Sequence, residues 1–251
     1  MKNVNFSTKI KIYISITCVL LFVLIILNSL FGNPISKNIS NKKIRSYIHD
    51  NYKNLNLTID EPMYNFKMAE YFCKVYSKTQ PDVYFEVSYR DKEIFDSYKY
   101  EVLSGQNTVN RIEREYADIL TPLLKKEFGA SFDRVRIDYS MEDVINKNIP
   151  KLNEPLDIND RYYKEILLDL KDTDMTVESF SFNLTKLNSI LIKNGYNIDE
   201  YMVWIGEPTD DYAYISGIKP SMIDEDLIKL IQYCKDNKKE AFQRYEISIT
   251  L

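Results

Sequence analysis

Residues 12–31 read IYISITCVLLFVLIILNSLF, a run that contains no charged side chain. About 20 apolar residues span a bilayer as an α-helix, and in lipid a helix pairs its own backbone groups. The run is longer than the ~7–15 apolar residues of a cleaved signal peptide, and no A-x-A site follows it. Cys18 lies inside the run, whereas a lipidated cysteine would stand at its end. The sequence therefore predicts an uncleaved transmembrane signal-anchor helix that begins at Ile12 and ends at Phe31.

Charged residues on both sides of this helix bear on its orientation. Lys2, Lys9 and Lys11 precede it, and no acidic residue occurs before Asp50. Positive charge before a first span favours a cytoplasmic N-terminus, although the basic residues within 37–45 favour the opposite orientation. We expect a single-pass protein of the cell membrane, with a short cytoplasmic tail and the bulk of the chain outside the cytoplasm.

The composition is that of a globular, mildly acidic protein. The 251 residues include 33 Lys and Arg against 37 Asp and Glu, for a formal net charge of −4. Residues 1–31 contribute lysines but no acids, so the remainder is more acidic still. Nucleic-acid binding needs clustered positive charge, so we expect no nucleic-acid partner. Heavy use of Asn, Ile, Lys and Tyr is typical of a bacterial genome rich in A and T.

The chain after the span, from Gly32-Asn33-Pro34 onward, alternates between helical and strand periodicity. In chain order the pattern predicts a helix, three strands, a long helix and a strand, over residues 36–52, 56–60, 71–76, 83–89, 109–129 and 135–139. Pro122 would kink or split the long helix, and Gly129 would end it. With residues 1–32 as tail and anchor, we expect a first α+β domain over residues 33–149.

Pro150 and Pro155 flank a polar stretch that predicts a linker. Beyond it the pattern predicts strand, helix, strand, strand, helix and strand, over residues 166–170, 176–195, 201–205, 212–218, 227–234 and 245–249. An S-x-x-D capping box at Ser221 and Asp224 precedes the last helix. Because the order βαββαβ is that of ferredoxin-like folds, we expect such a unit as a second α+β domain over residues 156–251.

The sequence contains none of the motifs that carry common chemistry. G-x-G-x-x-G, G-x-S-x-G, H-E-x-x-H and C-x-x-C are all absent, and His49 is the only histidine. We therefore expect no catalytic residue, no metal and no cofactor. Pairs of acids such as Glu113 and Glu115 fit a solvated surface, and the alternative is a hydrolase that uses two carboxylates.

One predicted loop indicates candidate binding residues. Asp210, Asp211 and Tyr212 lie between two predicted strands and are the best candidates for an exposed loop tip that binds a ligand. Cys73 and Cys234 fall in different predicted domains, where they could form a disulfide or stay two buried free thiols. We expect a non-enzymatic binding or interaction module with a partner protein in the envelope; the alternative is an envelope hydrolase.

A family resemblance rests on three groups of residues. They are FGNPISK at 31–37, YNFK at 64–67, and VLSGQNT at 102–108 followed by Arg111 and Glu115-Tyr116. In this order and spacing they resemble the YfjL-like proteins of low-GC Gram-positive bacteria, over residues 31 to about 128. The resemblance implies one N-terminal span and two extracytoplasmic domains in a bacterial envelope, and no functional residue to carry over. Met68-Ala69-Glu70 replaces the polar, Gly-containing turn of relatives, so we expect a different hairpin there.

Overall fold

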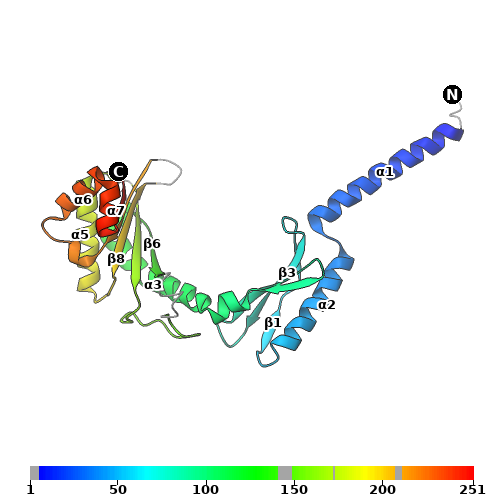
Figure 1. Cartoon of the computed structure of the whole chain (residues 1–251), viewed down its shortest axis with the longest axis horizontal. Coiled ribbons are helices and arrows are strands. Elements are labelled where there is room, and N and C mark those ends of the chain that lie inside the picture. Colours follow the sequence, from blue (N-terminus) through cyan, green and yellow to red (C-terminus); the bar gives the residue numbers. More distant parts are fainter. Residues whose placement is uncertain (1–5, 141–148, 172, 207–210) are drawn as a thin grey trace. The chain divides into compact units, whose positions relative to one another are not determined.

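The computed structural model describes residues 6–140, 149–171, 173–206 and 211–251. The chain divides into two compact units, Met1–Leu103 and Ser104–Leu251 (Figure 1). The fold class is α+β, as predicted: a long apolar helix comes first, and each unit then builds a β-sheet with its own helices.

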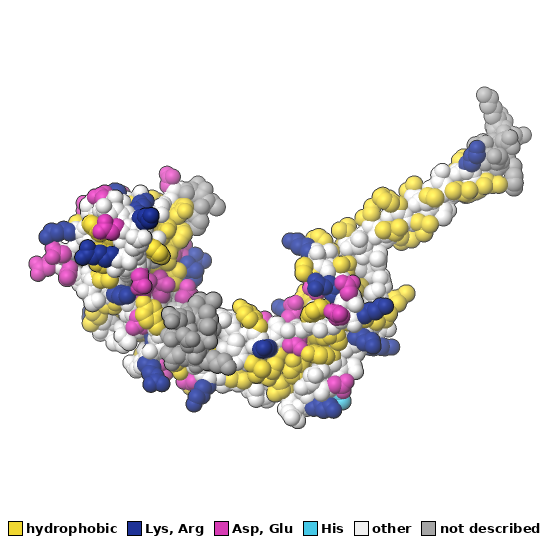
Figure 2. Space-filling model, in the orientation of Figure 1, with side chains coloured by type: hydrophobic (Ala, Val, Ile, Leu, Met, Phe, Trp, Pro, Cys, Tyr) yellow, Lys and Arg dark blue, Asp and Glu magenta, His cyan; other side chains and the backbone are white. Residues whose placement is uncertain are grey.

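The apolar stretch forms helix α1 (Phe6–Phe31), which begins before and ends with the predicted span. Its large side chains are exposed rather than packed on protein; Phe22, for example, is 64 % exposed. Figure 2 shows hydrophobic side chains along this helix. Among the described residues it is the one stretch long and apolar enough to cross a membrane. Length and composition thus indicate a membrane anchor.

The apolar helix ends at Phe31, as predicted, and a turn at Gly32 follows it. Gly32 has a φ of +67°, and a Cβ there would lie 2.2 Å from the hydroxyl of Tyr71, so only glycine fits. Asn33 then caps the next helix, α2 (Pro34–Asn51), because its side chain accepts a hydrogen bond from the backbone N of Ser36 at 2.8 Å. The chain therefore leaves α1 through a fixed turn.

The sheet of the first unit is antiparallel. Its strands are β1 (Leu57–Ile59), β2 (Met63–Asn65), β3 (Glu70–Ser77), β4 (Tyr84–Arg90) and β5 (Glu93–Asp96). They are ordered β1-β3-β4-β5, and β2 also pairs with β3. The strands predicted over residues 71–76 and 83–89 are confirmed as β3 and β4, which pair with Cys73 opposite Val87; both residues pack in a core with Ile44 and Ile48 of α2. The period-2 pattern did not predict β2 and β5, which are only three and four residues long.

The second unit holds a mixed sheet together with its helices. Its elements are α3 (Gln106–Phe128), β6 (Phe132–Tyr139), β7 (Lys164–Leu170), α5 (Val177–Lys193), β8 (Glu200–Gly206), β9 (Tyr212–Ile218), α6 (Leu227–Asp236), α7 (Lys238–Tyr245) and β10 (Ser248–Thr250). The strand order is β10-β9-β8-β7-β6, antiparallel except where β7 meets β8. Helix α3 contains Pro122 without being split.

Three details of the predicted second domain are wrong. In a split βαβ unit a strand would insert between β7 and β8, but these two pair directly, so the fold is not ferredoxin-like. The capping box at Ser221 and Asp224 does not cap α6; the Asp224 carboxylate accepts from the backbone N of Asp226, at 2.9 Å. Tyr245 ends helix α7 instead of opening the last strand.

The structure also places α3 and β6 in the second unit, whereas the sequence grouped residues 33–149 together. The reason is long-range pairing, since β6 lies antiparallel to β7. In addition, Ile112, Tyr116 and Leu120 of α3 pack into the core of the second unit. Hydrophobic periodicity shows that a strand is half-buried but not which strand it pairs with.

Candidate binding surface

In the described part of the second unit, helices pack against one face of the sheet, and no described helix covers the other face (Figure 1). Helices α5, α6 and α7 lie together on one side of the sheet (Figure 1). Buried side chains such as Leu168, Val203 and Ile215 form the core, and their chain neighbours point the opposite way. These neighbours, which we call the open face, are Arg134, Arg136, Asp138, Glu165, Leu167, Asp169, Glu200, Met202, Trp204, Tyr212 and Tyr214.

Three aromatic rings form a stack on the open face. The ring of Trp204 lies 5.1 Å from that of Tyr214, its cross-strand partner, at an interplanar angle of 16°. It lies 5.2 Å from the ring of Tyr212, at 10°. Such cross-strand aromatic contacts hold side chains in place, and Tyr212 remains 40 % exposed. The stack therefore presents a rigid aromatic surface where β8 ends and β9 begins.

An ion pair with an unused oxygen lies beside this stack. The guanidinium of Arg134 donates from Nε and Nη2 to Oδ2 of Asp169, at 2.8 and 2.6 Å. Within the part of the chain that the structure describes, Oδ1 of Asp169 is buried without a hydrogen-bond partner, and so is Nε1 of Trp204. Asp169 and Trp204 are register partners on the parallel strands β7 and β8. A buried acceptor and a buried donor thus belong to neighbouring residues, each lacking a hydrogen bond that proteins normally supply.

Three carboxylates line the other end of the open face. Asp138, Glu165 and Glu200 are register partners across β6, β7 and β8. Burial, and then the charges of Glu200 and Asp138, raise the pKa of Glu165 to about 7 against the opposing effect of Arg136. Tyr163 donates a hydrogen bond to Oε2 of Glu200 at 2.7 Å. Within the described ranges, no group of three acidic, His or Cys side chains is arranged to hold a metal ion.

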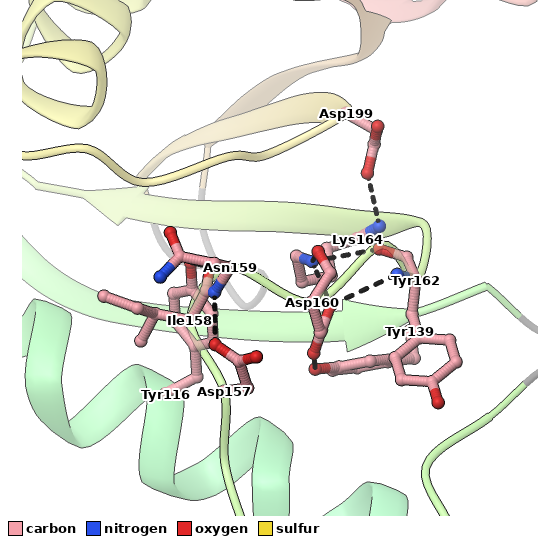
Figure 3. Close-up of polar contacts among 9 residues, drawn as sticks. All are labelled: Tyr116, Tyr139, Asp157, Ile158, Asn159, Asp160, Tyr162, Lys164 and Asp199. Atoms are coloured by element: carbon pink, nitrogen blue, oxygen red, sulfur yellow. Dashed lines mark hydrogen bonds and ion pairs between the residues drawn. The ribbon is translucent and has the colours of Figure 1, made fainter.

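A buried lysine fixes the ends of these strands (Figure 3). Lys164 is fully buried, and its Nζ donates to the carbonyl oxygens of Asp160 and Tyr162, both at 3.0 Å, and pairs with the Asp160 carboxylate. The other oxygen of that carboxylate accepts from the Tyr139 hydroxyl at 2.7 Å. The backbone N of Lys164 donates to Asp199 at 2.9 Å. An ammonium has three protons, and all three are used here, so the cluster is a structural clamp.

The residues that the sequence singled out are only partly placed by the structure. Asp210 lies outside the described residues, Asp211 is exposed just before β9, and Tyr212 belongs to the aromatic stack. Sequence reasoning missed Trp204 and Tyr214. A signal was present, because both alternate with buried apolar residues and so had to point away from the core.

Two family models match the chain. The first, described as the YfjL-like N-terminal domain, matches residues 7–98, and the second, described as the YfjL-like C-terminal domain, matches residues 115–232. The chain belongs to the YfjL-like family. The predicted membership is thereby confirmed, and it reaches well beyond residue 128. Comparison with curated proteins and with solved structures gives no match.

The YfjL-like models relate simply to the two units. The YfjL-like N-terminal domain covers α1 from its second residue and all five strands of the first sheet. The YfjL-like C-terminal domain includes β6 to β9, and therefore the whole open face. The first unit ends at Leu103, which lies between the residue ranges that the two family models match.

The cysteines of this YfjL-like protein are not placed for chemistry. Cys73 and Cys234 are free thiols, each completely buried in the core of its own unit. Burial raises the pKa of Cys73 to about 11 and also raises the pKa of Cys234. Because the thiolate is the nucleophile, thiols of this kind are inert.

Proposed function

We propose that the protein is a single-pass, membrane-anchored binding protein of the bacterial cell envelope, and that the open face of its second unit holds a polypeptide segment of a partner. Helix α1 supports the anchor through its length and its exposed apolar side chains. The observation that carries the binding site is the pair of unpartnered atoms, Oδ1 of Asp169 and Nε1 of Trp204, beside an exposed aromatic stack in the described part of the chain.

The chemistry of these groups selects the ligand. A peptide unit offers both an N–H, which Asp169 could accept, and a C=O, to which Trp204 could donate. A buried polar atom without a hydrogen bond destabilises the fold by about 1–3 kcal/mol. A ligand that supplied the missing hydrogen bond would remove this penalty, and the gain would favour binding. Trp, Tyr and Arg are also the residues that most often dominate protein interfaces. The face therefore combines rigid aromatic contact area with unused hydrogen-bonding groups.

Photo-crosslinking in intact cells tests this site. With p-benzoylphenylalanine in place of Tyr212, the full chain should form a discrete crosslinked product. The matched control replaces Phe242 of α7, which is 61 % exposed but lies on a helix rather than on the open face. Adding Trp204→Ala or Asp169→Asn to the Tyr212 variant should abolish the product. Equal products at both positions, or none at Tyr212, would contradict a binding role for the open face.

The second candidate function is an envelope hydrolase, favoured by the carboxylates of Glu165 and Glu200. They are register partners, and the pKa of Glu165 is raised to about 7, so Glu165 can donate a proton near neutral pH, as the acid of a carboxylate pair must. Isolated cell-wall glycan incubated with the full chain gives the test. A hydrolase should release soluble fragments and lose that activity on Glu165→Gln and Glu200→Gln, whereas a binding protein should release none.

The orientation is tested by reporters fused after Leu251. Lysines precede the span and no acid does, which favours a cytoplasmic N-terminus. An alkaline-phosphatase reporter, active only outside the cytoplasm, should therefore be active. Activity of a cytoplasm-only reporter in its place would reverse both the orientation and the envelope location.

A further inference from the structure

Two hairpin tips of the first sheet lie beside the C-terminal end of helix α1. A cavity of about 340 Å³ is lined by Asn28 and Gly32 at the end of the helix and by Ala69 and Asp91 at the two tips. Ala69 belongs to the β2–β3 connection, and Asp91 to the β4–β5 connection. The tips therefore reach at least the last turn of α1.

The β2–β3 tip and the neighbouring turn of α2 expose large apolar side chains. Phe66 is 56 % exposed, and Met63 and Met68 show comparable exposure. On the other side of the junction, Phe31 and Ile35 are 73 % and 75 % exposed. A cavity of about 570 Å³ includes Phe31 and Met63 in its lining, so the two groups adjoin each other. Exposed apolar side chains that cluster in this way mark a surface that contacts a membrane or another protein.

Basic side chains border these apolar groups. Lys67 stands between Phe66 and Met68, Lys37 lines the larger cavity, and Arg90 lines the smaller one, next to Asp91. Apolar insertion flanked by Lys and Arg is the composition of segments that lie in the interface of an anionic bilayer.

We propose that the β2–β3 tip inserts into the headgroup region of the same bilayer that α1 spans, and that Lys67, Lys37 and Arg90 bind anionic phospholipid headgroups there. This inference rests on the proposed membrane anchor. If the apolar run ends in lipid at Phe31, its last turn lies at the membrane interface, and the tips beside Asn28 lie at the same depth. The sheet of the first unit would then lie directly on the membrane surface, held there by the β2–β3 tip as well as by α1.

Tryptophan quenching by lipids brominated on their acyl chains measures this insertion. The full chain is reconstituted into vesicles of brominated phosphatidylcholine, with or without phosphatidylglycerol, in a Trp204→Phe background that removes the only tryptophan. Phe66→Trp reports on the tip and Phe22→Trp reports on the span. Tyr76→Trp is the matched control, because it lies on β3 six residues from Glu70, or about 20 Å along the strand.

Insertion predicts that the tryptophan emission of the Phe66→Trp variant is quenched, while that of the Tyr76→Trp variant is not. Adding phosphatidylglycerol should deepen the quenching at position 66, and Lys67→Glu should remove that increment. Quenching at position 22 without quenching at position 66 would overturn the insertion and leave the anchor standing. Absence of quenching at position 22 would overturn the anchor and the insertion together. Equal quenching at position 66 with and without phosphatidylglycerol would overturn the recognition of anionic headgroups.

Discussion

The hydroxyl of Tyr71 hydrogen-bonds both backbone groups of Asn33: it accepts from the amide N at 2.7 Å and donates to the carbonyl O at 2.9 Å. Asn33 is the N-cap of α2 and follows the turn at Gly32. One side chain of the first sheet thus fixes the point at which the chain leaves the apolar helix. It also keeps the hairpin tips beside that point.

Tyr71→Phe should loosen this junction without unfolding the unit. The ring contact with Tyr64, at a centroid distance of 5.0 Å, is retained, but both hydrogen bonds to Asn33 are lost. A loss of roughly 1–3 kcal/mol in local stability is expected. Hydrogen exchange of peptides covering residues 33–40 should accelerate by about 5- to 150-fold, since 1.4 kcal/mol corresponds to a factor of about ten. Tyr76→Phe, at the other end of β3, is the control and should leave this exchange unchanged; acceleration in both variants would contradict the assignment.

Lys164→Met should destabilise the second unit by about 3–5 kcal/mol, because it leaves the buried carboxylate of Asp160 without its cation. Urea unfolding of the full chain in detergent, followed by the fluorescence of Trp204, measures the second unit alone, since this is the only tryptophan.

Adding Asp160→Asn to Lys164→Met should recover part of that loss, because no unpaired charge then stays buried. Lys229→Met is the matched control. It removes a lysine that also pairs with an aspartate, but in that pair both side chains are largely exposed, at 81 % and 71 %. The midpoint of unfolding should not move in the control. A Lys164 variant as stable as the wild type would show that the buried clamp does not stabilise the fold.

Glu113 should make the second unit less stable as pH rises from about 4.5 to about 7. Its carboxylate accepts from the backbone N of Tyr139 at 2.8 Å, yet burial dominates and raises its pKa from the ordinary 4.5 to about 7. Between these two values the folded state binds more protons than the unfolded state, so the free energy of unfolding falls with pH. Above pH 7 the penalty is complete, at most about 2 kcal/mol once solvent screening of a partly exposed group is allowed for.

Glu113→Gln keeps an acceptor for the Tyr139 amide and cannot ionise. The difference in unfolding free energy between wild type and this variant should therefore decline across that pH window and be constant on either side. Urea titrations at about pH 4, 5.5, 7 and 8 would measure it. A difference that is flat over this whole range would show that Glu113 titrates at its ordinary pKa.

The local pattern of apolar and polar residues predicted those helices and strands that form through interactions between residues close together in the chain. The apolar helix α1 is predicted by the absence of charge over residues 12–31 alone, and the β3–β4 hairpin by alternation on both sides of a turn at Pro81-Asp82. Helix α7 was missed because its eight residues are mostly polar. The capping box at Ser221 failed because a short sequence motif does not determine where a helix begins.

The candidate binding surface was predicted in one residue only, Tyr212. Its ring contact with Trp204 depends on the pairing of β8 with β9, and the position of Asp169 beside Trp204 depends on the pairing of β7 with β8. The sequence shows that these side chains point out of the core. It does not show that they share one face and touch, because that requires the strand order.

By itself, therefore, the sequence determined the apolar N-terminal helix, the α+β class and the family, all of which depend on composition, local periodicity and short motifs. Only the tertiary structure decided the strand order, the transfer of α3 and β6 to the second unit, and the contact of Tyr71 with Asn33 across 38 residues of chain. The physical reason is that the hydrophobic effect is non-directional, so an apolar side chain can be buried against any apolar partner. Strand pairing and side-chain hydrogen bonds are specific to their partners, and those partners lie far away in the sequence.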